Sequence, residues 1–132
     1  MRYSMINPSM VIDYPGGETV VQAVIAMLAL IVIIVMSVRS NTRFSNEQRL
    51  PMQWSFGGAV NWTAPRSLAL SFTPILAAIV LSAATIGTLV STPRPGQEGL
   101  KIPVIILLSL GLIGAHALHL WLIDRTIRAN DR

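Results

Sequence analysis

The sequence contains no cysteine, and only 12% of its residues are charged. The absence of thiols excludes disulfides, thiolate catalysis, iron–sulfur clusters and thioether-linked haem. The shortage of charge is equally informative, because an ordinary soluble domain carries about 25% charged residues. Hydrophobic residues make up 52% of the chain, and this balance points away from a water-soluble domain.

The hydrophobic residues form three long runs with neither a helical nor a strand-like alternation. A run of 18 or more apolar residues is long enough to cross the roughly 30 Å hydrocarbon core as a helix. A soluble fold of 132 residues could not bury three such runs on every side. The sequence therefore predicts an all-α integral membrane protein, a single domain over 1–132 with three transmembrane helices in a small bundle. The predicted spans cover residues 20–38, 68–90 and 102–123.

Basic residues predict the orientation of the chain. With three spans, the N-terminus and the second loop share one side, and the first loop and the C-terminal tail share the other. The first side has Arg2, Arg94 and Lys101, and the other has Arg39, Arg43, Arg49, Arg66, Arg125, Arg128 and Arg132. Because an excess of Lys and Arg is normally cytoplasmic, we expect the N-terminus outside and the C-terminus inside. We attribute the net charge of +4 to membrane orientation and to contact with anionic lipid headgroups. We expect no nucleic acid partner.

The first loop has the pattern of an interfacial β-hairpin over residues 50–65. Two runs with aromatic and β-branched residues flank the pair Gly57-Gly58, and glycine adopts the positive φ of a two-residue turn at little cost. Such a turn predicts three cross-strand pairs: Phe56 with Ala59, Trp54 with Asn61, and Gln53 with Trp62. Met52, Trp54 and Phe56 would share a face that rests on the bundle end, because an isolated hairpin is marginal in water. The alternative is an irregular loop that two tryptophans anchor at the interface.

The residues after this loop look like the start of a helix. The Thr63 side-chain oxygen can cap the first turn, and Pro65 is tolerated there because its missing N–H would be unpaired anyway. We therefore expect the second helix to begin near Ala64 and to enter the membrane near Leu68.

The stretch from Leu50 to Arg66 resembles a motif of a bacterial multi-spanning membrane family of unknown function, which includes immunity proteins against sporulation-delaying toxins. The motif runs approximately Leu-Pro-x-His-aromatic-x-x-x-Gly-x-x-Asp/Asn, followed by Lys or Arg and a transmembrane helix. The matching residues are Leu50, Pro51, Trp54, Gly58, Asn61 and Arg66, with Gln53 at the histidine position. The resemblance implies a bacterial inner membrane and a module that recognises a peptide or toxin. In larger members the motif loop is expected outside the cell, opposite to the prediction from charge.

Two histidines near the end of the third span are candidates for a polar site inside the membrane. His116 and His119 are three residues apart, so they share nearly one helix face. An ionisable residue in a span is a functional candidate, and a proton relay, a metal site and a haem ligand are the options. Both rings leave one side of one helix and cannot bracket a haem, and no Cys, Asp or Glu lies at that depth to complete a metal site. We therefore expect no metal and no cofactor, and favour neutral histidines that hydrogen-bond neighbouring helices.

Polar residues of the hairpin and the second helix are expected near these histidines, because the helix directions bring all of them to one end of the bundle. The candidate partners are Gln53, Asn61, Ser71 and Thr73. An unpaired buried polar group costs about 1–3 kcal/mol, so the hairpin amides are expected to satisfy the imidazoles.

Small residues recur at a spacing of four in the second and third spans. The pairs are Ala78 with Ser82, Ala83 with Gly87, and Gly111 with Ala115. Such pairs let helix backbones approach closely, so we expect them to pack the second helix against the third, with a dimer face as the alternative. The first span has few small residues and is expected to face lipid or a larger partner.

The sequence shows no pattern that indicates catalysis. All six acids lie outside the spans, and a transporter usually has charged or broken segments at the midplane. We therefore expect a non-enzymatic protein that binds the lipid bilayer and a protein partner. It would act either as an immunity-like recognition module or as an accessory subunit of a larger respiratory or photosynthetic complex. A proton or metal role of the histidines is a more remote option.

Overall fold

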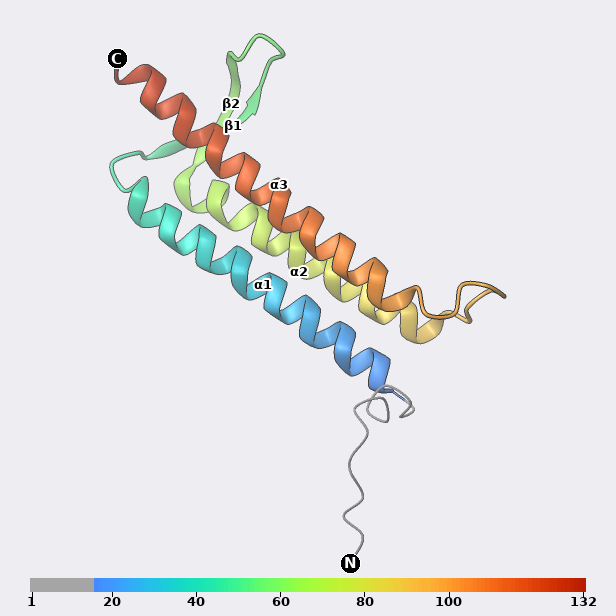
Figure 1. Cartoon of the computed structure of the whole chain (residues 1–132). Helices are drawn as coiled ribbons and strands as arrows, with labels where there is room; N and C mark the ends of the chain where they lie inside the picture. Colours follow the sequence, from blue (N-terminus) through green and yellow to red (C-terminus); the bar gives the residue numbers. More distant parts are fainter. Residues whose placement is uncertain (1–15) are drawn as a thin grey trace, which may run out of the picture.

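The computed structural model describes residues 16–132, which form three helices and one hairpin. The elements are α1 (Gly17–Arg43), β1 (Arg49–Trp54), β2 (Val60–Pro65), α2 (Arg66–Val90) and α3 (Lys101–Asn130). The helices form an elongated bundle, and the hairpin stands at the end where α1 and α3 finish and α2 begins (Figure 1). The N-terminus was predicted to lie outside the cell, but residues 1–15 are not among those that the structure describes.

All three helices are long and apolar enough to cross a membrane, so the chain is a multi-pass membrane protein. They contain 27, 25 and 30 residues, whereas about 20 residues suffice for the hydrocarbon core. The additional turns carry the polar residues that meet headgroups and water. The predicted three-span helical bundle is confirmed, and each predicted span lies inside one of these helices.

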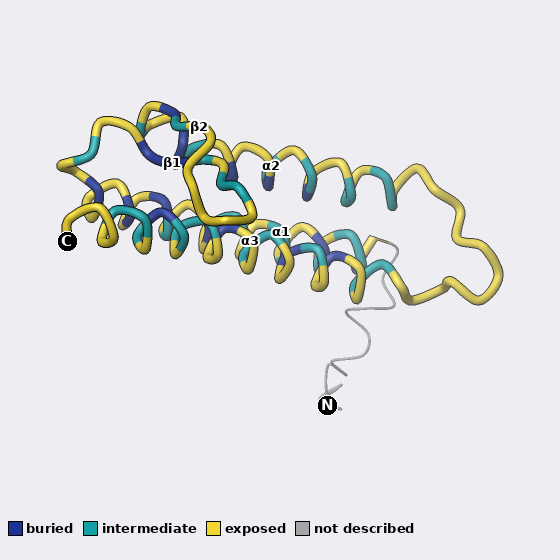
Figure 2. Tube along the Cα trace, turned by 90° about the horizontal axis from the view of Figure 1, so that it is seen from above, coloured by how far each residue is buried: buried dark blue, intermediate teal, exposed yellow. Residues whose placement is uncertain are grey.

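The bundle buries a narrow stripe of each helix and exposes large apolar side chains on its outer surface. Met27, Ile79 and Leu107 are 63%, 62% and 70% exposed. Figure 2 shows buried positions turned toward the neighbouring helices and concentrated near the hairpin, with the long connection between α2 and α3 exposed. Such an outer surface is unfavourable in water and suits hydrocarbon, where packing holds helices together.

The first helix was expected to face lipid or a larger partner, and it does expose Leu28, Ile31 and Ile34, but it is also the central helix of the bundle. α1 packs against both α2 and α3, and it does so more extensively than α2 and α3 pack against each other. Its buried face consists of Gln22, Ala29, Ile33, Ser37 and Ser40. Short side chains alternate with Ile33 on this face, so both neighbouring helices can approach the α1 backbone.

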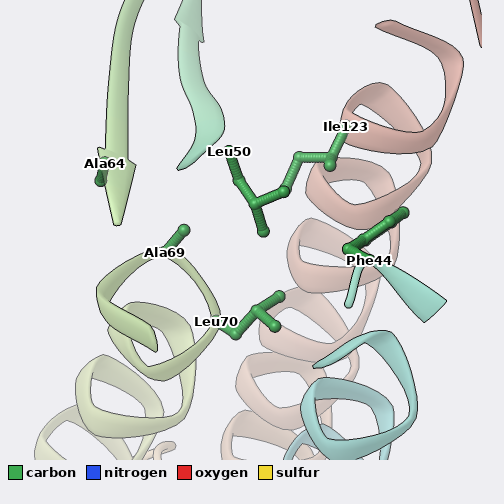
Figure 3. Packing of buried hydrophobic residues seen from close by; sticks show 6 residues of the cluster. All are labelled: Phe44, Leu50, Ala64, Ala69, Leu70 and Ile123. Carbon is green, nitrogen blue, oxygen red and sulfur yellow. The ribbon is translucent and has the colours of Figure 1, made fainter. Parts of the chain in front are cut away.

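A hydrophobic cluster joins the hairpin to the bundle end. Its buried members are Phe44, Leu50, Ala64, Ala69, Leu70 and Ile123. Figure 3 shows Leu50 of β1 and Ile123 of α3 pointing toward one another, with Leu70 of α2 beneath them. The predicted hairpin on the bundle end is therefore confirmed, and the irregular-loop alternative is wrong.

The second helix begins two residues after its predicted start near Ala64. Thr63 and Ala64 belong to β2, and the helix begins at Arg66 directly after Pro65, whose backbone is extended (φ −52°, ψ 141°). The Thr63 hydroxyl does not cap α2, because it accepts a hydrogen bond from Nε of Arg49 across the hairpin (3.0 Å). The strand thus passes into the helix without a connecting loop.

Candidate functional site

The hairpin turn differs from the predicted two-residue turn. Ser55 N donates to Ala59 O (2.8 Å) and Gly58 N donates to Ser55 O (2.9 Å), so three residues form the turn. Gly58 has a φ of +86°, which fits the glycine position of a three-residue hairpin loop with a bulge. The predicted Phe56–Ala59 pair is therefore wrong.

The strands contain two register shifts. Gln53 pairs with Trp62 as predicted, but Trp54 pairs with Val60 and not with Asn61. Met52 is the extra residue on β1 and Asn61 is the extra residue on β2. Bulges of this kind increase the local twist, and here they compensate each other, so that the register is restored before the turn.

One face of the hairpin is fixed to the helices. Leu50 and Pro51 are buried, and Met52 and Trp54 pack on the hydrophobic cluster. The Trp54 indole Nε1–H donates to the Thr126 hydroxyl of α3 (2.9 Å). Phe56, predicted on this same face, is instead fully exposed at the tip (116%), because the three-residue turn carries it beyond the bundle end.

Arg66 organises the connection between α1 and the hairpin. Its Nε–H donates to Asn41 Oδ1 (2.9 Å), and its Nη1 donates to the carbonyl oxygens of Phe44 (3.2 Å), Ser45 (2.6 Å) and Glu47 (3.0 Å). These three residues follow Arg43, the last residue of α1, so their carbonyls belong to the loop. The guanidinium therefore holds this loop in one conformation.

His116 lies in the interior of the bundle and is 1% exposed. Its Nε2 is 2.9 Å from the Ser37 hydroxyl of α1. His119 lies one turn closer to the hairpin, where its ring meets the Trp54 ring edge-on at 5.9 Å. The histidines thus join α3 to α1 and to β1.

Ser37 was missed by the sequence analysis, although a signal for it exists. Arg43 of α1 and Asp124 of α3 form an ion pair of 2.8 Å, which aligns the two helices. Ser37 lies six residues before Arg43 and His116 lies eight before Asp124, so both are at nearly the same depth. At 1.5 Å per residue, His116 lies roughly 12 Å from the ion pair along the axis of α3, on the side away from the hairpin.

None of the four predicted polar partners forms a hydrogen bond with a histidine in the part of the chain that the structure describes. Gln53 and Asn61 are exposed on the hairpin, because its polar edge turns away from the bundle, so the expected contact with the imidazoles is wrong. Ser71 donates to Leu68 O of its own helix (3.3 Å). Thr73 alone of the four is buried.

The small-residue pairs do not pack α2 against α3. Ser82, Ala83, Gly111 and Ala115 are exposed, whereas Ala78 and Gly87 are partly buried. The small helix residues that do lie in the interior are the alanines Ala29, Ala69 and Ala77 and the serines Ser37, Ser40 and Ser109. The prediction failed because four-residue spacing shows that small residues share a helix face, but not whether that face contacts another helix or lipid.

Charge is concentrated at the hairpin end. Within residues 16–132, this end has seven arginines and only the acids Glu47, Asp124 and Asp131. The opposite end balances Arg94 and Lys101 with Glu18 and Glu98, and Lys101 lies 3.8 Å from Glu18. Within residues 16–132 as a whole, no cluster of three or more His, Asp or Glu side chains could hold a metal ion.

These features define a class: a three-span membrane bundle capped by a fixed β-hairpin with a basic end. Comparisons with models of protein families, with curated proteins and with solved structures find no match for the chain.

Proposed function

We propose that the chain is a non-enzymatic protein of the bacterial inner membrane that binds a peptide or protein partner along the hairpin. The observation that carries this proposal is the open edge of β2. The sheet has two strands, so β2 pairs with β1 on one side only. Its residues Val60, Asn61 and Trp62 are exposed. An extended peptide can add to such an edge through backbone hydrogen bonds.

The fixed base of the hairpin supports this proposal. A free hairpin is marginal in water, but here β1 packs on α2 and α3 and Trp54 is hydrogen-bonded to Thr126. A strand that is already ordered loses less conformational entropy when it binds. The exposed Phe56 and Trp62 then supply apolar contact area next to the open edge, and aromatic residues of this kind are frequent anchors in interfaces.

The resemblance of residues 50–66 to the toxin-immunity family suggests a toxin-like peptide as the partner. Its matching residues Leu50, Pro51, Trp54 and Arg66 are those that anchor the hairpin. By the excess of arginine, we place the hairpin on the cytoplasmic side. The resemblance favours the opposite orientation, and site-specific labelling decides between the two.

Photo-crosslinking tests the proposal. A photoreactive amino acid at Asn61 or Trp62 should give one discrete adduct in cells, which mass spectrometry then identifies. Matched controls are the same probe at Gln97, in the loop at the opposite end, and at Ile79, on the outer face of α2. Adducts only from Asn61 and Trp62 support edge recognition.

The same experiment examines the accessory-subunit alternative. Adducts with large membrane proteins from Ile79 but not from Asn61, together with stoichiometric co-migration in mild detergent, would overturn the recognition proposal in favour of that role.

A further inference from the structure

A cleft separates the hairpin from the last turns of α3. One wall is the segment 54–60, and the other wall consists of Leu122, Arg125, Thr126, Ala129 and Asn130. Its volume is about 750 Å³. The hydrogen bond from Trp54 to Thr126 connects the two walls.

The cleft has a positive charge and no acidic lining residue. Arg125 is its cation, and the same side chain also lines a neighbouring hollow of about 480 Å³, together with Arg128 and Arg132. The one acid there, Asp124, is already bound by Arg43 (2.8 Å) and Arg128 (3.0 Å). Arg125 takes part in none of the ion pairs formed among residues 16–132.

The guanidinium of Arg125 is oriented by stacking. It lies over the Trp121 ring, 5.3 Å from the ring centroid, at a distance typical of a cation–π interaction. A stacked guanidinium keeps its planar set of N–H donors free, and this set matches two oxygens of a phosphate. The Arg125 guanidinium is therefore already oriented to bind an anion.

The depth of the cleft indicates where the anion comes from. Leu122 lines the cleft, and the predicted third span ends at the next residue, Ile123. Arg125 is two residues further on, which places it roughly 3 Å outside that level. The headgroup layer occupies roughly the next 5–8 Å outside the hydrocarbon core. Trp54, which lines the cleft, and Trp121, which stacks on Arg125, are of the residue type that prefers this layer.

We propose that this cleft is a binding site for an anionic phospholipid, with the lipid phosphate on the Arg125 guanidinium. Leu122 would contact the glycerol and the first acyl carbons. A free phosphate has the same chemistry as the lipid phosphate, but the position at headgroup depth favours the lipid. The phosphate site is on α3, whereas the proposed partner binds along the outer edge of β2, and Val60 is the residue that lies at both.

Tryptophan fluorescence tests the site, because all three tryptophans of the chain, Trp54, Trp62 and Trp121, lie at this end. The full chain is placed in phosphatidylcholine vesicles, and phosphatidylglycerol with brominated acyl chains is added as a quencher. Quenching should saturate at a lower lipid fraction than with brominated phosphatidylcholine. Arg125→Gln should need about fivefold more phosphatidylglycerol, as expected for one arginine near an anionic surface. The matched control Arg94→Gln, in the loop at the opposite end, should behave like the wild type.

Three results would overturn the proposal. The first is equal quenching by the two brominated lipids in the wild type, a comparison that needs no variant to fold. The second is an unchanged lipid requirement for Arg125→Gln at an unchanged unfolding temperature. The third is displacement of brominated phosphatidylglycerol by inorganic phosphate or by a soluble phosphopeptide, which would assign the cleft to a free anion or to a peptide. No displacement by either competitor supports the lipid.

Discussion

The Ser37 hydroxyl and Nε2 of His116 lie 2.9 Å apart and join α1 to α3 inside the bundle. Both side chains are buried, at 8% and 1% exposure. In a membrane interior, where packing replaces the hydrophobic effect between helices, such a bond defines which faces of two apolar helices meet.

We predict that Ser37→Ala and His116→Leu are energetically coupled. The double variant should lose less stability in detergent than the sum of the single variants, by about 0.6 kcal/mol and up to about 1.7 kcal/mol, as measured for other interhelical hydrogen bonds. Reversible unfolding, followed by circular dichroism, measures each term. Ser82→Ala, on an exposed position, is the control and should change little. Additive losses for Ser37 and His116 would show that the bond contributes nothing.

A double-mutant cycle that combines Asn61→Ala with His116→Leu should show no energetic coupling. Asn61 is exposed on β2 and His116 is in the bundle interior, so each substitution should act independently. Asn61→Ala alone is expected to change the free energy of unfolding by less than about 0.5 kcal/mol, as is usual for a surface position. A coupling as large as that of Ser37 would mean that the hairpin reaches the histidines.

Gly58→Ala should loosen the hairpin, whereas Gly57→Ala should not. Gly58 has a φ of +86° and a Cβ added there would touch nothing, so its cost is in the backbone, about 1–2 kcal/mol for an L-residue. A Cβ at Gly57 would lie 3.8 Å from the Ser55 hydroxyl, an ordinary contact, and no positive φ is required there. Hydrogen exchange of the Ala59 amide measures the difference. Equal exchange in both variants would contradict the turn geometry.

Arg66 should not be replaceable by lysine. Its guanidinium donates to Asn41 and to three loop carbonyls, and a lysine ammonium cannot reproduce this planar geometry. We expect Arg66→Lys to destabilise the protein by roughly 2 kcal/mol, within the usual range for charged hydrogen bonds. Arg128→Lys, whose side chain is 68% exposed, is the control and should cost less than about 0.5 kcal/mol. An Arg66→Lys variant as stable as the wild type would show that the loop orders itself.

The orientation can be measured directly, because the chain has no cysteine of its own. Single cysteines at Ser45, Gln97 and Asn130 occupy exposed positions at both ends of the bundle. The charge asymmetry predicts that an impermeant maleimide labels the Gln97 position in intact cells, and the other two only after permeabilisation. The reverse pattern would favour the orientation expected from the family resemblance.

Much of the architecture was predictable because it depends on local composition. A long uncharged run has few choices other than a helix across the bilayer, so the three spans follow from counting. Gly57 and Gly58 between two strand-like runs were enough to predict a hairpin, but the predicted Gln53–Trp62 pair forms only because the bulge at Asn61 offsets the three-residue turn. The predicted Trp54–Asn61 pair does not form because Asn61 is the extra, unpaired residue of a bulge. Bulges increase the local twist of a hairpin, and hydropathy patterns do not reveal them.

The sequence by itself therefore determined that this chain is a three-span membrane protein with a basic end and a hairpin there. Only the tertiary structure decided which face of each helix turns inward, because lipid and protein interior are equally apolar and hydropathy cannot tell them apart. That is why Ser37, and neither Gln53 nor Asn61, meets His116. It is also why the small pair Gly111 and Ala115 faces outward, while Arg125 comes to lie between the hairpin cleft and a second basic hollow.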